Sequence, residues 1–205
     1  MMRGAGLLAG ALALGLGAGN LSAQQGWSVT LTSGYSNGIG DTFEGPGSLS
    51  ATASVYRPIS RVLDAGIELG YHGLGTTTTR LPDLYGPGST YREDFSTSAW
   101  QGTIGVRLRP STSRIRPYAG AGAGAYLLRI HDVIEVRDAS GQPIPQYAFR
   151  QTDAELHPGV NAALGVDRLV SIGRIGVGVH VRWHGIIAAS GIADFFSLSL
   201  GLALN

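Results

Sequence analysis

The sequence predicts an all-β fold, an eight-stranded antiparallel up-and-down barrel, and three observations support this prediction. Eight runs of about 8–12 residues alternate large apolar residues with small or polar ones, which is typical of strands with two different faces. The connections between these runs alternate between long and short. Charged residues make up only 14% of the 205 residues, whereas about 25% is usual in a soluble domain.

The first segment of the chain has the layout of a secretory signal peptide. Arg3 is its one cation, a Leu/Ala/Gly run follows, and Leu21-Ser22-Ala23 then offers a cleavage position after about Ala23, although Leu21 is not a small residue. An uncleaved N-terminal helix of about 20 residues is the alternative. We therefore expect a signal peptide over residues 1–23 and one barrel domain over residues 24–205.

The eight expected strands follow from their period-two alternation. In the third run, for example, Leu63, Ile67 and Tyr71 share one face and Glu68 lies on the other. The expected strands cover about 26–36, 48–57, 62–72, 96–109, 115–129, 156–167, 173–184 and 193–204.

The connections indicate which kind of barrel these strands form. Those after the second, fourth and sixth strands are short, whereas the long ones cover roughly 37–47, 73–95 and 130–155. Outer-membrane barrels alternate in this way, with short periplasmic turns and long external loops. Many of the acidic residues lie in the long connections, where they could bind divalent cations or a basic partner, or be solvated loop residues.

The two strand faces predict which solvent each one meets. A soluble barrel turns its polar face to water, where lysine and glutamate are expected, but all 15 basic residues here are arginine. The polar face is mostly Ser, Thr, Gly and Ala, which suit the narrow interior of an eight-stranded barrel. We therefore expect the aliphatic face to meet lipid, which makes the predicted fold a transmembrane β-barrel.

Aromatic residues on the aliphatic face are expected to form girdles at the two membrane interfaces. Trp27 and Tyr35 lie eight residues apart with the same parity, and Tyr118 and Tyr126 repeat this spacing. Eight strand residues span about 26 Å along the strand. With a strand tilt of about 35–45° this corresponds to a height of about 20 Å, which is near the ~25 Å height of the apolar band. The expected girdle residues are Trp27, Tyr35, Tyr71, Trp100, Tyr118, Tyr126, Trp183 and Phe196.

Charged and polar residues on the other face are expected to form a network in the lumen. Glu68 and Arg107 lie on neighbouring strands, and Arg182 and Asp167 are a second candidate pair. The network forms either a structural polar plug or a narrow, gated ion path, and the small bore favours the plug. The expected lumen residues are Asp64, Glu68, Arg107, His157, Asn161, Asp167, His180 and Arg182.

Residues 116–130, RPYAGAGAGAYLLRI, are expected to form the fifth strand of the barrel. Their uncharged stretch is too short for a helical span of about 20 residues but matches a barrel strand of about 9–11. We expect Tyr118, Tyr126 and Leu128 to face lipid together with the glycines, and the alanines and Arg129 to face the lumen.

Taken together, the signal peptide, the eight alternating strands and the PYAGAGAGAY segment resemble the OmpA/OmpX/OmpW-like small outer-membrane β-barrels of Gram-negative bacteria. The resemblance implies a protein of the bacterial outer membrane, exported through the inner membrane by a cleaved signal peptide. Its implied partners are outer-membrane lipids, the outer-membrane assembly machinery and periplasmic chaperones, with no nucleic acid. The chain departs from the pattern at Leu204-Asn205, where such proteins usually end in an aromatic residue.

Three motifs suggest chemistry, but each has a simpler explanation. Gly34–Gly38 matches G-x-S-x-G, yet the strand–turn–helix setting of a nucleophile elbow is missing. His180 and His184 share a strand face, but Arg182 between them opposes a metal cation. His131-Asp132 is the most suggestive pair for a lipid-modifying enzyme, although no serine is clearly brought to it. We expect no metal, no cofactor and no catalytic residue.

The sequence thus favours an integral barrel with a structural or surface-interaction role, external long loops and a polar-plugged lumen. A narrow channel or transporter for small or hydrophobic solutes is the alternative, and an enzyme that modifies envelope lipids is third. The sequence does not identify an extracellular ligand.

Overall fold

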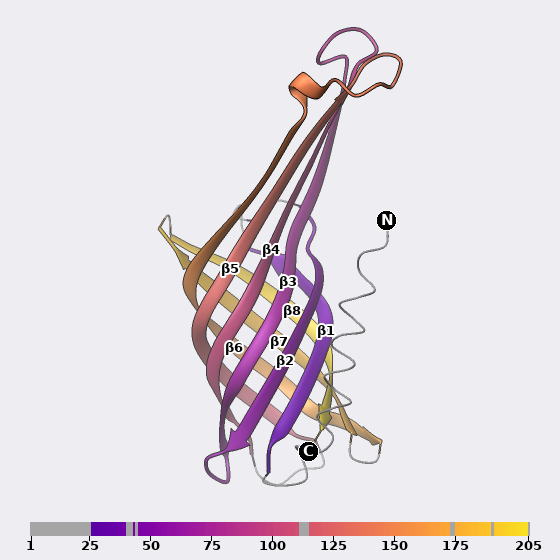
Figure 1. Cartoon of the computed structure of the whole chain (residues 1–205). Coiled ribbons are helices and arrows are strands. Elements are labelled where there is room, and N and C mark those ends of the chain that lie inside the picture. Colours follow the sequence, from indigo (N-terminus) through magenta and orange to yellow (C-terminus); the bar gives the residue numbers. More distant parts are fainter. Residues whose placement is uncertain are drawn as a thin grey trace.

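The structure, a computed structural model, contains a closed barrel of eight antiparallel strands. It describes residues 26–39, 43, 45–110, 115–172, 175–189 and 191–204, so the expected signal peptide and Asn205 lie outside the described residues. Each strand pairs with its neighbours in sequence, and β8 closes the barrel against β1 (Figure 1). The up-and-down topology predicted from the sequence is therefore confirmed. The strands are β1 (Ser28–Gly38), β2 (Ser48–Pro58), β3 (Leu63–Pro82), β4 (Thr90–Leu108), β5 (Pro117–Arg137), β6 (Phe149–Ile172), β7 (Ile175–Ala188) and β8 (Gly191–Leu204).

Four of the strands are much longer than their sequence pattern predicts. The strands β3 to β6 contain 19–24 residues each, whereas the other four contain 11–14. Much of the expected long connections 73–95 and 130–155 is therefore strand rather than loop. These segments do not show the regular alternation of large apolar and small residues that marks the barrel strands, but they continue the backbone pairing across four strands, as in the row Thr76↔Ser96↔His131↔Thr152.

The long strands continue past the barrel rim as a four-stranded sheet, which we call the projecting sheet. It consists of residues 75–82, 90–97, 130–137 and 149–156, and it rises above the other four strands in Figure 1. A β-bulge at Gly73–Gly75 marks where β3 leaves the barrel. The bulge turns Leu74, which is fully buried, into the lumen, and the inward-facing residues of β3 change from even to odd numbers beyond it.

Aliphatic side chains cover the outside of the barrel. Ile104 is 72% exposed and Leu164 is 65% exposed. Soluble monomeric proteins rarely expose a large continuous apolar surface of this kind to water. The same outward face includes Leu49, Val55, Ile67, Leu69, Val106, Leu108, Val160, Val181, Leu198, Leu200 and Leu202. Across the described residues, no helix is long and apolar enough to cross a membrane.

The side-chain parity expected for residues 117–128 is wrong. Tyr118 and Tyr126 are buried in the lumen together with the glycines, and the alanines point outward. The reason is steric, because a Cβ at Gly124 would clash with the backbone of β4, at 2.7 Å from Thr103 Cα. Likewise a Cβ at Gly122 would lie 3.0 Å from Asn161 Oδ1. The glycines thus leave room for lumen side chains of the neighbouring strands.

Candidate functional site

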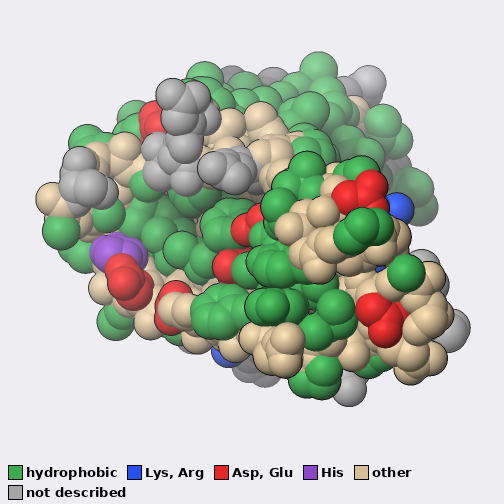
Figure 2. All heavy atoms as spheres, turned by 90° about the horizontal axis from the view of Figure 1, so that it is seen from above, with side chains coloured by type: hydrophobic (Ala, Val, Ile, Leu, Met, Phe, Trp, Pro, Cys, Tyr) green, Lys and Arg blue, Asp and Glu red, His purple; other side chains and the backbone are tan. Residues whose placement is uncertain are grey.

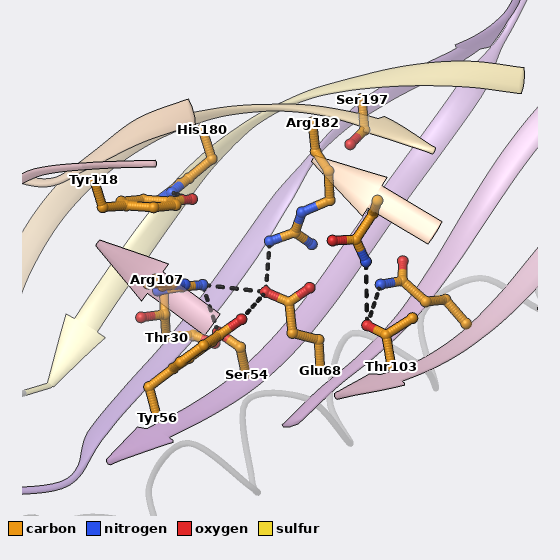
Figure 3. Close-up of polar contacts among 12 residues, drawn as sticks. Thr30, Ser54, Tyr56, Glu68, Thr103, Arg107, Tyr118, His180, Arg182 and Ser197 are labelled. Atoms are coloured by element: carbon orange, nitrogen blue, oxygen red, sulfur yellow. Dashed lines mark hydrogen bonds and ion pairs between the residues drawn. The ribbon is translucent and has the colours of Figure 1, made fainter. Parts of the chain in front are cut away.

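The centre of the lumen contains an ion network on Glu68 of β3. Arg182 of β7 donates to Glu68 Oε1 at 2.8 Å, and Arg107 of β4 reaches the same oxygen at 3.3 Å (Figure 3). The Tyr56 hydroxyl of β2 donates to this oxygen at 2.9 Å. Asp167 of β6 lies 3.6 Å from Arg107, so two guanidinium groups face two carboxylates. All four charged side chains are about 95% buried or more.

The structure forms one of the two ion pairs expected from the sequence and rearranges the other. Glu68 contacts Arg107 on the adjacent strand as expected, but Arg182 contacts Glu68 across the lumen rather than Asp167 on its neighbouring strand. The side chain of Arg182 extends toward the barrel axis, where Glu68 lies, as Figure 3 shows. Asp167 contacts Arg107 and, at 3.9 Å, His180 Nδ1.

Two tyrosines hold the Arg107 guanidinium between their rings. The guanidinium carbon lies 3.8 Å from the centroid of the Tyr56 ring and 4.5 Å from that of Tyr118. The Tyr118 hydroxyl also meets His180 Nδ1 at 2.9 Å. Tyr118 was expected in the girdle, and Tyr56 was not identified from the sequence as a lumen residue. The signal for Tyr56 was present, because it shares the even-numbered face of β2 with the serines of that strand and Thr52.

At the short-turn end of the barrel, Asp64 is paired with Arg109 rather than with the central network. Arg109 Nη2 donates to Asp64 Oδ1 at 2.8 Å. Arg109 follows the last residue of β4 and its side chain is partly exposed, so this ion pair lies near the lower end of the lumen.

Above Glu68, toward the long connections, lies a layer of hydrogen-bonded neutral side chains. Ser36 Oγ lies 3.0 Å from His72 Nδ1, and His72 Nε2 lies 3.0 Å from Gln101 Oε1. Asn161 donates to Thr103 in the same region, at 3.2 Å.

Tyr126 belongs to this layer and not to the lipid-facing girdle. Its hydroxyl meets His184 Nδ1 at 3.1 Å, and its side chain is fully buried. His184 stacks on Phe195 with ring centroids 4.3 Å apart. A buried tyrosine hydroxyl needs a polar partner, and His184 supplies one on the lumen side.

The Ser36–His72–Gln101 chain places the serine of the G-x-S-x-G motif beside a histidine. The order nucleophile, base and orienting group resembles that of covalent hydrolases. However, Ser36 and His72 are completely buried in the lumen, and the motif lies in the extended strand β1 rather than at a strand–helix turn. The three hydrogen-bonded side chains therefore fill part of the lumen, and Ser36 is not accessible to a substrate in this structure.

A cluster of apolar side chains packs at the mouth of the lumen above this polar layer. Phe43, from the β1–β2 connection, packs edge-to-face on Phe195 with ring centroids 6.3 Å apart. Leu74 and Ile186 are fully buried in the same cluster. The complete set is Phe43, Leu74, Ala99, Tyr126, Ile186, Ala193 and Phe195, with Leu128 packed against it. Leu128 was expected on the lipid face, but its contact with this cluster places it inside the barrel.

The other histidines make separate contacts with different partners. His157 lies at the upper rim with its Nε2 3.2 Å from Glu155, apart from the central network, and His131 Nδ1 meets Thr152 Oγ1 at 2.8 Å. His180 and His184 contact different tyrosines. Within the described ranges, no three His, Asp or Glu residues lie together as metal ligands would.

Six of the eight expected girdle residues lie on the outer surface. Tyr71 packs edge-to-face on Trp100 at a centroid distance of 5.1 Å, and Tyr35 and Phe196 are each 49% exposed. Tyr35, Trp183 and Phe196 lie in the halves of their strands nearer the long connections, whereas Tyr71 and Trp100, which pair with each other, lie just on the short-turn side of the midpoints of the long strands β3 and β4. With Tyr118 and Tyr126 inside, Trp27 is the one expected girdle residue at the short-turn end.

The projecting sheet carries opposite charges on its two faces. Its outward face continues the outside of the barrel, and its inner face continues the lumen side, because side chains alternate along each strand. The outward face carries Arg80, Arg92, Arg137 and Arg150 with the acids Asp94 and Glu135. Arg129, just below the sheet on β5, also points outward and not into the lumen as the sequence predicted. The inner face carries the acids Glu93, Asp132, Asp153 and Glu155 and, within the described strands of the sheet, no arginine.

The tips of the two hairpins support each other. The Tyr85 ring, in the β3–β4 connection, stacks on Tyr147 of the 3₁₀ helix η3 (Pro145–Tyr147) at 4.5 Å. Asp138 caps the β5–β6 connection by accepting hydrogen bonds from the Ser140 and Gln142 amides, both at 2.9 Å. The projecting sheet thus ends in a structured tip.

A closed barrel with an aliphatic exterior and a filled polar interior is the fold of the small eight-stranded outer-membrane β-barrels. Comparison with solved structures bears this out for the fold. Neisserial surface protein A (NspA) is similar over 88% of this chain and 97% of its own, with 13% identity and a TM-score of 0.51.

Two further solved structures are similar in part. The attachment invasion locus protein Ail of Yersinia pestis has 10% identity over 88% of this chain and all of its own, with a TM-score of 0.45. The N-terminal barrel domain of Pseudomonas aeruginosa OprF has 11% identity over 86% of this chain and 97% of its own, with a TM-score of 0.41. No protein-family model and no curated protein matches the sequence.

Proposed function

We propose that this chain is an integral protein of the bacterial outer membrane whose sealed barrel anchors an interaction sheet outside the cell. The observation that carries the proposal is the continuation of β3, β4, β5 and β6 beyond the barrel as the projecting sheet. A barrel that served only as a membrane anchor would need neither this paired, four-stranded extension nor its structured tip.

Placement in the membrane is supported by the outer face of the barrel and by its closed wall. The aliphatic outer face favours lipid, and the closed wall leaves no sheet edge within the barrel. The short turns then lie in the periplasm and the projecting sheet outside the cell. A cleaved signal peptide, the assembly machinery and periplasmic chaperones belong to the same proposal.

Transport through the lumen is the less favoured role. The Glu68 network occupies the centre of the lumen, and the cluster around Phe195 closes its mouth. Paired charges with no net excess give an ion no favourable site to enter. An enzymatic role is also less favoured, because Ser36 and His72 are buried away from any substrate.

Shortening the projecting sheet tests the surface-interaction role. Joining Thr76 to Ser96 and His131 to Thr152 through Asn-Gly turns removes the sheet and preserves the paired residues at the barrel rim. Cells that express the shortened chain should lose adherence to a panel of immobilised extracellular proteins and polysaccharides, while the barrel keeps its heat-modifiable gel mobility. Equal adherence by the intact and the shortened chain would contradict the proposal.

A further inference from the structure

The inner face of the projecting sheet is apolar as well as acidic. Leu81, Ile130 and Phe149 are 38–46% exposed on this face or at its edge. Tyr91 and Phe95 of β4 lie on it too, and the stacked Tyr85 and Tyr147 adjoin its upper end. Seen from above, acidic side chains lie among hydrophobic ones and little of the basic surface is in view (Figure 2).

The acidic groups of this face are spread among the apolar ones. Glu93 accepts a hydrogen bond from the Tyr91 hydroxyl at 2.8 Å, and Asp153 accepts one from Gln151 at 2.6 Å. Asp132 Oδ1 has no hydrogen-bond partner among the described residues. Since no arginine lies on this face, none of these three carboxylates forms an ion pair within the described chain.

The acids on the outward face of the same sheet differ from those on the inner face, because they form ion pairs with arginines. There, Arg92 neutralises Asp94 at 2.8 Å, and Arg137 lies 3.7 Å from Glu135. The strands β4 and β5 thus carry paired acids on one face and, on the other, acids that have no basic partner in the part of the chain that the structure describes. A partner that covers the inner face must supply both cationic groups and apolar surface.

We propose that the inner face of the projecting sheet binds a cationic, amphipathic peptide segment of an extracellular partner, with basic side chains on Glu93, Asp132 and Asp153. The aromatic residues beside these carboxylates bind the apolar side chains and the faces of guanidinium groups. The inference rests on the surface-interaction role proposed above and specifies the chemistry of its ligand.

A pair of matched double variants tests this proposal on the full chain in zwitterionic lipid nanodiscs. Glu93→Gln with Asp132→Asn removes two acids from the inner face, and Asp94→Asn with Glu135→Gln removes two from the outward face of the same strands. Both variants change the net charge equally, so a difference between them reports the face and not the overall charge. The probe is a short fluorescent peptide of alternating Arg and Trp, and the comparison peptide has Glu at each Arg position.

The intact chain should bind the Arg/Trp peptide, with affinity that falls as salt rises, and should not bind the Glu/Trp peptide. The inner double variant should weaken binding about five- to tenfold, whereas the outward variant should change it less than about twofold. The milder Asp153→Asn variant should weaken binding about twofold, and it serves if the double variant disturbs the sheet.

Three outcomes would overturn the inference. These are equal binding of the two peptides, equal weakening by the two double variants, and concentration-dependent self-association of the chain in place of peptide binding. Each of them leaves adherence through the projecting sheet intact, so the failure of this inference is distinct from failure of the proposed function. The proposed function itself would be contradicted by a different result, namely equal adherence of the intact and the shortened chain.

Discussion

Glu68 is the residue on which the lumen network depends, because a single carboxylate oxygen receives Arg107, Arg182 and Tyr56. Glu68→Gln should lower the free energy of unfolding by about 3–5 kcal/mol, since it leaves buried guanidinium charge without its main partner. Urea unfolding in detergent measures the change. Arg92→Gln is the control, because its pair with Asp94 is half-exposed and should cost less than about 1 kcal/mol. An E68Q variant as stable as the R92Q variant would contradict the network's role.

Gly124 tests the inward orientation of the glycines of β5. Gly124→Ala should destabilise the barrel by about 1–3 kcal/mol, because the added methyl group meets the β4 backbone. Gly102→Ala, on the adjacent strand but facing outward, should be nearly neutral, since its nearest neighbour would be Leu69 Cδ2 at 3.8 Å. Thermal unfolding followed by gel mobility compares the two. A larger cost at Gly102 than at Gly124 would show that the parity is reversed.

At the scale of elements, the β5–β6 tip is expected to depend on pH through Asp138. Hydrogen bonds from Ser140 and the Gln142 amide hold the pKa of Asp138 below its usual range. A lowered folded-state pKa means that these bonds stabilise the tip above the ordinary aspartate pKa of about 4 and are lost as pH falls through the lowered value.

Amide hydrogen exchange by NMR checks this expectation. Protection of the Ser140 and Gln142 amides should be present at pH 6 and be lost under strongly acidic conditions. Asp138→Asn is the control, since the amide cannot titrate and its exchange should follow only the intrinsic pH dependence. The same acid-dependent loss in D138N would rule out Asp138 as the cause.

The sequence predicts the barrel strands well where large and small residues alternate, as in β7 and β8. It underestimates β3 to β6, because runs such as Thr76–Thr79 have no apolar residues to mark a strand and the residues paired with them alternate irregularly. Backbone pairing with neighbours, which a single strand's pattern does not show, orders these segments. The inner charged residues and the Glu68–Arg107 pair between adjacent strands were predictable from parity, but the partner of Arg182 was not, since it reaches Glu68 across the lumen.

The parity of β5 could not be derived from its own residues. Both of its faces are small, so Tyr118 and Tyr126 look equally suited to a membrane interface and to a lumen. What decides their side is the room that the glycines give Arg107 and Asn161, together with the histidines that meet the tyrosine hydroxyls.

For the whole molecule, the sealed lumen predicts the absence of steady conductance. The purified protein in a planar bilayer should give no well-resolved, persistent channel at neutral pH, because the Glu68 network and the apolar cluster around Phe195 both block the path. A change of Arg182 to Ser should weaken the first barrier but leave the second, so it should not create a large pore. Stable single-channel steps from the intact protein would instead favour the transporter role.

The most direct test of the membrane-spanning barrel is cell fractionation combined with gel mobility before and after heating. The protein should separate with the outer membrane and should migrate differently when unheated, because the closed barrel resists unfolding by detergent. Recovery as a soluble periplasmic monomer, without any heat-dependent shift in mobility, would contradict the proposal that the aliphatic exterior lies in lipid.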